Sequence, residues 1–287
     1  MKKLLLLLLL ALMIPLSAGA EEAAPAAPVL EVHQLCIGCA DGYLIRLGDI
    51  EIMIDGGNAN PKVPTDDVVN YLRAAGVGEL DAYIVTHWHL DHCMNLNAVL
   101  AEFGAADTVV YSPSPALHED YDPLANGVYR QMKDGDVVTI GGMEFICVGP
   151  AQLKQDGRCN MDSLNFVLRY GERRILFTAD YAASGNILSK YQEICADVDI
   201  LKFPHHAIEP FEIGRQTARN ANPEYVLVPS ANGRGKVRSF LGNCGVALPF
   251  ENFLNNADGH VLVLTDGAEY LEIIRHVDPA DYAPAAE

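Results

Sequence analysis

Apolar and polar residues follow one another along this chain in short runs, which predicts many brief strands and few helices. Residues 43–47 and 51–55 form the first two predicted strands, with a turn at Gly48-Asp49 between them. A mostly apolar run at 80–86 is typical of a strand buried inside a sheet. Helical spacing of apolar residues appears at 65–75, at 95–103 and near Ile187, Leu188 and Tyr191. The remaining predicted strands cover 108–111, 137–140, 143–148, 164–170, 174–178, 200–203, 225–228, 260–265 and 270–275.

The order of these elements predicts the fold class. Strands come first, a mixed α and β region follows, and strands return at the end. This order favours an α/β protein built as a four-layer αββα sandwich over a doubly wound nucleotide-binding fold. About 250 residues are enough for a single domain with a sizeable core. We expect one domain over residues 30–277.

The ends of the chain predict processing and flexible segments. Lys2 and Lys3 precede an apolar run from Leu4 to Leu16 and then a small-residue segment that ends at Ala20, the pattern of a secretory signal peptide. The apolar run is shorter than the ~20 residues of a membrane-spanning helix. We expect cleavage after residue 20 and a secreted, extracytoplasmic protein that keeps no stable membrane anchor. Alanine and proline at 21–29 and 278–287 predict a linker and a flexible tail.

Charge and cysteine content limit the partners. The chain has a formal net charge of −18, which becomes −20 once the two lysines of residues 1–20 are removed. A field of that sign repels polyanions, so it argues against long nucleic acid and favours a small-molecule substrate. Seven cysteines leave at least one thiol unpaired, and Cys36-x-x-Cys39 alone is a weak disulfide signal. Nothing in the sequence predicts the oligomeric state.

A dense group of metal-ligand side chains follows the strand predicted at 80–86. His87, His89, Asp91 and His92 lie within six residues, and they include three of the nine histidines of the chain. Imidazole nitrogens and carboxylate oxygens are the usual ligands of hydrolytic zinc. Alternating side chains in such a loop would send 87 and 89 to one metal and 91 and 92 towards a second.

Further ligands are expected at the ends of later strands. Asp180 follows the strand at 174–178, where a carboxylate can bridge two metals, and His205-His206 follows the strand at 200–203. Consecutive side chains after a strand point in opposite directions, so only one histidine of the pair is expected to face the metals.

In residues 87–92 the chain resembles the metallo-β-lactamase superfamily, whose signature is H-x-H-x-D-H. The resemblance covers residues 30 to 275. Residues 44–57 are similar to the opening strands that end in Asp-Gly-Gly, and Thr178-Ala179-Asp180 resembles a Thr-Gly-Asp segment. Leu201 to His206 resembles the Leu-Lys-x-x-His-His segment of the hydrolase domain of competence DNA-uptake channels. Asn160 to Leu164 fits the Asn-x-x-Ser-Leu pattern of the same branch.

The resemblance implies a ligand set. His87 and His89 would hold a first metal; Asp91, His92 and His205 would hold a second; and Asp180 would bridge them. Many relatives place another histidine on the first metal where this chain has Asn160. His206 would act on the substrate, while Asn160, Ser163 and Asn232 would contact the substrate or support the ligands. The implied cofactor is zinc, up to two ions, with manganese as an alternative.

The resemblance also implies an activity, a hydrolase in which a metal-bound hydroxide attacks a small phosphodiester or a related ester or lactone. Asp91 would orient the hydroxide or accept its proton. The substrate-facing loops depart from the branch: Ala207-Ile208 replaces Gly-Ser, and Asn232-Gly233 is not followed by His-Pro. These departures leave a second hypothesis, a secreted binding protein with the same fold that has lost turnover. Metal content and a phosphodiester assay distinguish the two.

Overall fold

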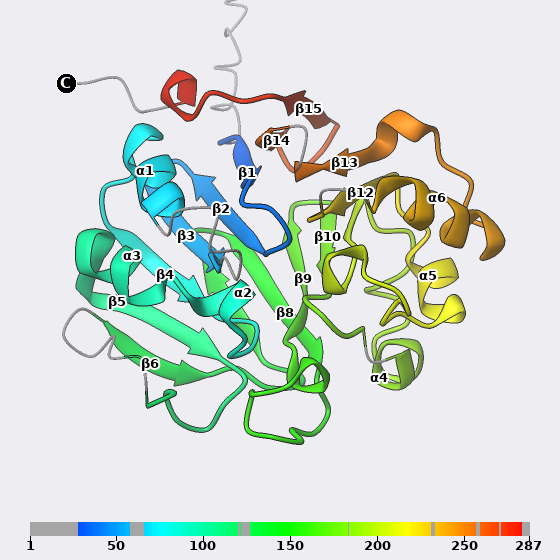
Figure 1. Ribbon diagram of the computed structural model, residues 1–287, viewed down its shortest axis with the longest axis horizontal. Helices are drawn as coiled ribbons and strands as arrows, with labels where there is room; N and C mark the ends of the chain where they lie inside the picture. Colours follow the sequence, from blue (N-terminus) through cyan, green and yellow to red (C-terminus); the bar gives the residue numbers. More distant parts are fainter. Residues whose placement is uncertain are drawn as a thin grey trace, which may run out of the picture.

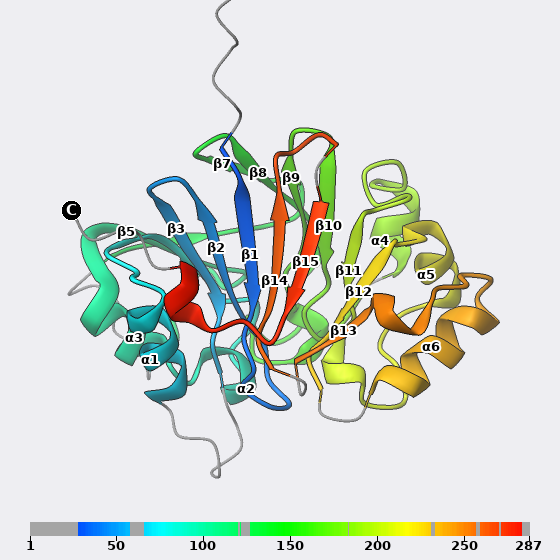
Figure 2. The same ribbon diagram turned by 90° about the horizontal axis from the view of Figure 1, so that it is seen from above.

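Two sheets packed face to face form the centre of the molecule, and helices cover the outer face of each sheet (Figure 2). The computed structural model describes residues 28–57, 66–119, 121, 127–182, 184–230, 233–256, 259–269 and 271–282. The predicted four-layer αββα sandwich is confirmed. Cys36, Cys39 and the other five cysteines form no disulfide.

The first sheet has eight strands, and it contains both the beginning and the end of the described chain (Figure 1). In sheet order they are β15 (Leu271–Arg275), β14 (Val261–Thr265), β1 (Leu30–Gln34), β2 (Gly42–Leu47), β3 (Ile50–Asp55), β4 (Leu80–Ile84), β5 (Gly104–Ser112) and β6 (Val128–Gln131). Its outer face carries α1 (Asp66–Ala74), α2 (Leu90–Cys93) and α3 (Leu96–Phe103).

The second sheet has seven strands. In sheet order they are β13 (Phe253–Asn255), β12 (Tyr225–Val228), β11 (Ile200–Lys202), β10 (Arg173–Phe177), β9 (Asn165–Tyr170), β8 (Met143–Gly149) and β7 (Val137–Ile140). Its outer face carries α4 (Ser184–Ser189), α5 (Arg215–Ala221) and α6 (Arg234–Asn243). Short 3-10 helices include η2 (Asn160–Asp162), η3 (His205–Ala207), η4 (Phe250–Asn252) and η6 (Pro279–Tyr282).

Apolar side chains of the two inner faces form the central core. Phe177 lies 5.1 Å from Phe166 and 5.3 Å from Tyr43, measured between ring centroids, so rings from both sheets meet there. Strand periodicity explains the layering, because neighbours along a strand point to opposite faces. Tyr43 and Ile45 of β2 join this core, whereas Leu44 packs under α1 and α3. Burying apolar area on both faces of each sheet is the main stabilising contribution.

Parallel strands make up one half of each sheet, and the polar residues gather at the ends of these strands. β3, β4 and β5 run parallel in the first sheet, and β10, β11 and β12 run parallel in the second. The carboxyl ends of parallel strands share one edge of a sheet, where ligands usually bind. The segments that follow β4, β10 and β11 carry the histidines and aspartates singled out in the sequence.

The structure describes only part of the terminal segments that the sequence predicts to be a signal peptide, a linker and a tail. The segment predicted as a signal peptide lies outside the described residues, and so does most of the linker. Part of the predicted tail forms η6, which lies beside α1. Within the described part of the chain, no helix has both the length and the apolar character needed to cross a membrane.

Candidate functional site

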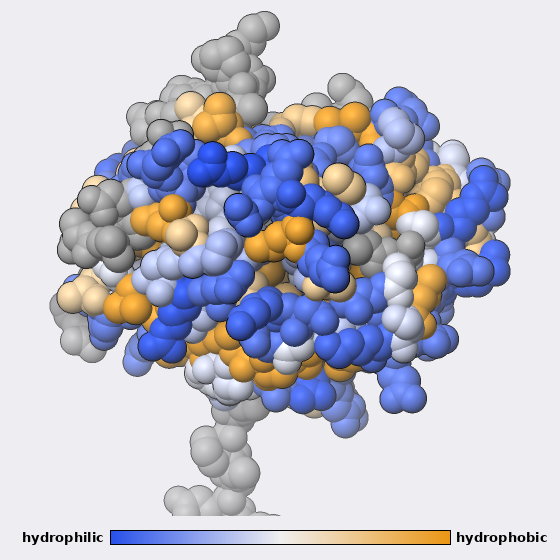
Figure 3. Space-filling model, turned by 90° about the horizontal axis from the view of Figure 1, so that it is seen from below, coloured by the Kyte–Doolittle hydropathy of each residue, from blue (hydrophilic) through white to orange (hydrophobic). Residues whose placement is uncertain are grey.

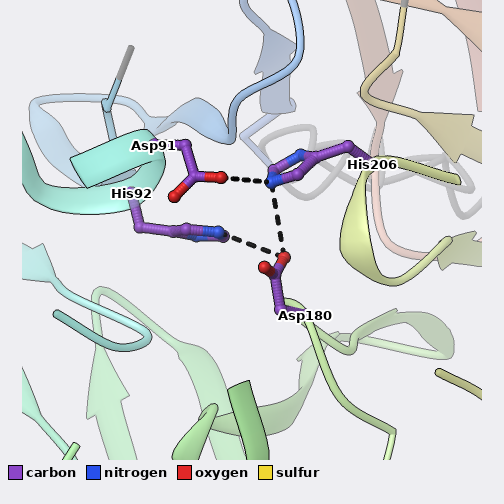
Figure 4. A group of neighbouring side chains, drawn as sticks. All are labelled: Asp91, His92, Asp180 and His206. Carbon is purple, nitrogen blue, oxygen red and sulfur yellow. Dashed lines mark ion pairs between the residues drawn. The ribbon is translucent and has the colours of Figure 1, made fainter. Parts of the chain in front are cut away.

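Side chains from four segments converge between the two sheets. His87 and His89 come from the loop after β4, Asp91 and His92 from α2, and Asp180 from the loop after β10. His206 enters from η3, on the opposite side from α2, and Asp180 lies below both (Figure 4). Residues more than a hundred positions apart in the sequence are therefore brought to one point.

Asp180 lies at the centre of two groups of ligand atoms. Its Oδ1 is 3.1 Å from Nε2 of His92 and 3.4 Å from Nε2 of His206, and Nε2 of His206 is 3.2 Å from Oδ2 of Asp91. Its Oδ2 faces the other way, 3.8 Å from Nε2 of His87. The ligand atoms of Asp91, His92, Asp180 and His206 form one compact group, and those of His87, His89 and Asp180 form another.

The histidine pair after β11 differs from the sequence expectation. His206, rather than His205, lies in the group with Asp91 and His92, and it is fully buried. His205 is 25% exposed, and its Nε2 lies 3.9 Å from Oδ2 of Asp180, on the side of His87. Both rings thus face Asp180, whereas we expected only one to do so.

Backbone conformation explains why both rings face inward. His205, His206 and Ala207 have φ values of 50°, 48° and 57°, a left-handed turn in which consecutive side chains do not alternate as in a strand. A left-handed conformation costs roughly 1–2 kcal/mol per non-glycine residue. Such strain is found at functional sites, where the surrounding structure must hold it in place.

Hydrogen bonds on the side away from Asp180 orient the imidazole of His92. Nδ1 of His92 donates to Oδ2 of Asp55 at 2.9 Å, which directs Nε2 towards Asp180. Asp55 ends β3 and also accepts hydrogen bonds from the backbone N–H and the hydroxyl of Thr86. A carboxylate behind a histidine fixes the ring and its tautomer, as in many metal sites. From the sequence, Asp55 was expected only to end a strand and to begin the Asp-Gly-Gly segment, with no role at the site.

A buried ion pair that was not predicted from the sequence supports the same site. Lys202 and Asp41 are each 1% exposed, and the ammonium group of Lys202 contacts the Asp41 carboxylate. Asp41 lies 3.6 Å from Nδ1 of His206 and 3.7 Å from Nδ1 of His92. A lysine inside an otherwise apolar strand was the available signal, because a buried ammonium needs a partner.

The predicted supporting residues have different positions. The amide of Asn160 lies 3.2 Å from Nε2 of His205. The hydroxyl of Ser163 accepts the backbone N–H of Asp180 at 3.3 Å and lies 3.5 Å from Nδ1 of His87. Asn232 lies outside the described residues.

The side chains of the site have the free ligand atoms, the spacing and the charge that bound cations require. Nε2 of His87, His92 and His206 and Oδ1 of Asp180 are buried but make no hydrogen bond. Ligands about 2.0–2.2 Å from a tetrahedral zinc ion lie roughly 3.4 Å from one another, close to the separations around Asp180. The buried and half-buried carboxylates of Asp41, Asp55, Asp91 and Asp180 outnumber the single ammonium of Lys202, and divalent cations would balance this excess of negative charge.

The imidazoles of His87 and His92 have pKa values shifted in opposite directions. Burial lowers the pKa of His87 well below its usual value, and the neighbouring charge of His92 lowers it further. Burial also opposes the charge on His92, but the carboxylates of Asp180 and Asp55 outweigh it and raise its pKa well above the usual value. For Asp180, burial is again outweighed, here by His92, so its pKa lies well below the usual value. His87 is therefore neutral and Asp180 ionised, both in the form that binds a metal, whereas His92 must give up a proton before its Nε2 can bind one.

Comparison with solved structures identifies the fold. The metallo-beta-lactamase fold protein YhfI from Bacillus subtilis superposes with a TM-score of 0.51 at 17% identity, covering 79% of this chain and 96% of that one. A diphosphatase of the PhnP family gives 0.50 at 14% identity, covering 79% and 94%. CmlA, a diiron β-hydroxylase from Streptomyces venezuelae, gives 0.52 at 16% identity, covering 88% of this chain and 55% of that one. At these identities the likeness concerns the fold alone.

The sequence itself carries the family assignment. The profile of the metallo-beta-lactamase superfamily matches residues 40–210, more than half of the chain. The matched region begins at Ala40, beside Asp41, and ends just after His205-His206, so it contains both groups of ligand atoms. With this match and the two-sheet fold, the chain belongs to the metallo-beta-lactamase superfamily.

Proposed function

We propose that this protein is an extracytoplasmic, metal-dependent hydrolase of small phosphodiesters or related esters and lactones. The observation that carries the proposal is the pair of ligand groups that share Asp180. Zinc, up to two ions, suits the mixture of imidazole and carboxylate ligands, and manganese is the alternative. When bound, such cations activate water and stabilise negative charge on the oxygen atoms of a substrate.

The residues of the site divide into buried and accessible ones. His87, His92, Asp180 and His206 are buried, while His89, Asp91 and His205 are partly exposed. The accessible residues therefore mark the side from which substrate enters. Asp91 accepts the contact from His206 with one oxygen and reaches solvent, so its carboxylate is placed to orient a water molecule and accept a proton.

Asn160 and His205 lie side by side on the accessible side of the site. The Asn160 amide and the His205 ring are in contact at 3.2 Å, and both are partly exposed. Polar groups held beside a ligand cluster can bind an oxygen atom of the substrate and fix its orientation. The excess negative charge of the chain favours small substrates over long nucleic acid.

The test combines metal analysis with a substrate panel. Protein purified without chelator is analysed for metal and assayed on phosphodiesters, lactones and β-lactams. We expect one to two equivalents of a transition metal and activity on at least one ester class. The Asp91→Asn variant keeps the size of the side chain, so we expect it to fold normally and lose at least about a hundredfold in kcat. Less than about a tenth of an equivalent of metal after soaking would overturn the proposal, as would full activity of Asp91→Asn.

A further inference from the structure

Trp88, the single tryptophan of the chain, lies between two metal-ligand histidines, His87 and His89. Its indole packs against the rings of Tyr121 and His118, with centroids 5.3 Å and 5.7 Å away. On the face of the molecule seen from below, hydrophobic side chains appear only in separate patches on a mostly hydrophilic surface (Figure 3). Trp88 is enclosed by comparison, since only 7% of it is exposed.

Two hydrogen bonds hold Trp88 to two other loops. Its backbone N–H donates to the carbonyl of Gly157 at 2.8 Å, and its indole N–H donates to the hydroxyl of Ser114 at 2.6 Å. The Ser114 hydroxyl in turn donates to the carbonyl of Asp156. The loops that follow β4, β5 and β8 therefore meet at this indole (Figure 1). We call Trp88, Ser114 and Gly157 the indole latch.

The indole latch leaves no space for a side chain at residue 157. Gly157 has a φ of 87°, in the left-handed region that favours glycine. A Cβ at this position would overlap the hydroxyl oxygen of Ser114 and lie 3.0 Å from Cδ1 of Trp88. The loop after β8 is thus fixed directly against the hydrogen-bonded pair.

The same loop continues from the latch to the metal ligands. The buried carboxylate of Asp162 accepts three backbone N–H groups of this loop, including that of Gly157 at 2.9 Å. The next residue is Ser163, whose hydroxyl lies 3.5 Å from Nδ1 of His87. The contacts that begin at Trp88 therefore return to the histidine directly before it, so the latch and the ligand are held as one unit.

The two groups of ligand atoms differ in number. Three residues form the group of His87, His89 and Asp180, whereas four form the group of Asp91, His92, Asp180 and His206. An ion with fewer ligands depends more on how well those ligands are positioned before it binds. The group of four has its own supports, because Asp41 donates its backbone N–H to the carbonyl of Asp91 and the Asp55 carboxylate holds His92.

We propose that Trp88 is a positioning residue for His87 and His89, and that the indole latch determines whether the centre holds its second ion. The proposal rests on the metal centre of the proposed hydrolase and assigns different supports to its two halves. Without the latch, the protein keeps the ion bound by Asp91, His92 and His206 and binds the other ion weakly.

Titration calorimetry of the full chain, freed of metal and titrated with Zn²⁺, measures both ions. We expect two sites in the wild type. Ser114→Ala and Trp88→Phe remove the same hydrogen bond from its two ends, so each should weaken one site about ten- to a hundredfold and keep the other. The double variant should lose little more than either single variant. Ser189→Ala in α4 is the matched control, because its hydroxyl also donates to a backbone carbonyl, and it should bind both ions normally.

Two backgrounds identify the site that is weakened. In His89→Ala, where the group of three is already incomplete, adding Ser114→Ala should change zinc binding little. In His206→Ala the same addition should still weaken the remaining ion about ten- to a hundredfold. This pattern would not arise from a general loss of stability, which affects both backgrounds.

Tryptophan fluorescence reports the latch itself, because Trp88 is the only tryptophan. Acrylamide should quench it weakly in the wild type and more strongly in Gly157→Ala, together with loss of one ion. Equal weakening of both sites in Ser114→Ala, two unchanged sites in Ser114→Ala, or a single site in the wild type would each overturn the proposal.

The ester panel keeps this proposal separate from the proposed hydrolase function. Zinc binding that depends on the latch without turnover of any ester would support the latch and reject the hydrolase. Turnover with zinc binding that does not depend on the latch would overturn the latch and leave the hydrolase standing.

Discussion

The ammonium group of Lys202 contacts the carboxylate of Asp41 in the interior of the protein, directly behind the two imidazoles of His92 and His206. Nζ of Lys202 also donates to the carbonyl oxygen of Ala179, the residue before Asp180, at 2.5 Å. One buried charge therefore supports both the histidines and the central aspartate. Asp41 is tied to α2 as well, since its backbone N–H donates to the carbonyl of Asp91.

We expect Lys202→Met to lower the free energy of unfolding by about 3–5 kcal/mol, because it leaves the Asp41 carboxylate buried without its cation. It should also weaken metal binding about ten- to a hundredfold, as changes behind metal ligands do. Urea unfolding and chelator competition measure the two effects. In the Asp41→Asn/Lys202→Met double variant the loss of stability should be smaller than the sum of the single losses. Additive losses would show that the two residues act independently.

The histidine pair gives a second prediction. His206 is fully buried between Asp91 and Asp180, so His206→Ala should lose the ion of that group and most activity. His205 is partly exposed and lies on the side of His87, so His205→Ala should keep the ion beside His92 and bind metal more tightly than His206→Ala. Metal content after dialysis against a weak chelator measures the difference. Loss of metal only in His205→Ala would restore the order expected from the sequence.

The positions of His205 and His206 could be predicted only in part from the sequence. Spacing after a strand placed both histidines at the site, but the choice between them depends on the left-handed backbone of residues 205–207. No side-chain pattern reveals that conformation, because histidine and alanine rarely adopt it. The ligand motif at 87–92 was predictable because all its members lie in one short segment. Asp41 and Lys202 were not, since they meet only after 161 residues of chain have folded.

The helices and strands also divide into those that the sequence predicted and those that it did not. Strongly apolar strands such as β4 and β10 were predicted at nearly the right residues. β1, β6 and β13 were missed, as were α5 and α6. Val128 and Arg130 in β6 are exposed, and α6 buries little besides Val237 and Leu241, so the sequences of β6 and α6 show no clear apolar period. Tertiary contacts, rather than local preference, decide such elements.

A glycine beside α2 gives a third prediction. A Cβ placed on Gly57 would lie 2.1 Å from the backbone carbonyl carbon of Asp91 and 2.1 Å from the backbone nitrogen of His92. Gly57→Ala should therefore displace the helix that carries both ligands, lowering stability by about 1–3 kcal/mol and reducing metal affinity. Gly242→Ala in α6 is the matched control, because nothing lies within 4 Å of its Cβ. It should raise helix stability by up to about 1 kcal/mol and leave the metal bound. Unchanged metal affinity in Gly57→Ala would contradict the close contact.

The last prediction concerns acid stability and a histidine outside the metal centre. Burial lowers the pKa of His260 to about 4, and the neighbouring charge of His33 acts in the same direction. Its Nδ1 accepts the backbone N–H of Cys36 at 3.0 Å, and its ring packs against Tyr71 with centroids 4.3 Å apart. Protonation of Nδ1 would set two N–H groups against each other, so the folded protein needs the neutral ring.

The direction in which stability changes with pH follows from the pKa values of His260 in the folded and unfolded protein. In the unfolded chain His260 titrates near 6.5, so between pH 6.5 and pH 4 the unfolded state binds more protons than the folded state. Its contribution to stability is complete above pH 6.5 and is lost as the pH falls towards 4. After a discount for partial exposure, we expect about 1 kcal/mol to be lost between pH 7.5 and pH 5. His260→Asn can still accept the Cys36 N–H and does not titrate, so urea unfolding should show a smaller loss in this variant. His276→Asn, at an exposed position, should match the wild type. Equal acid sensitivity in wild type and His260→Asn would show that His260 does not contribute to it.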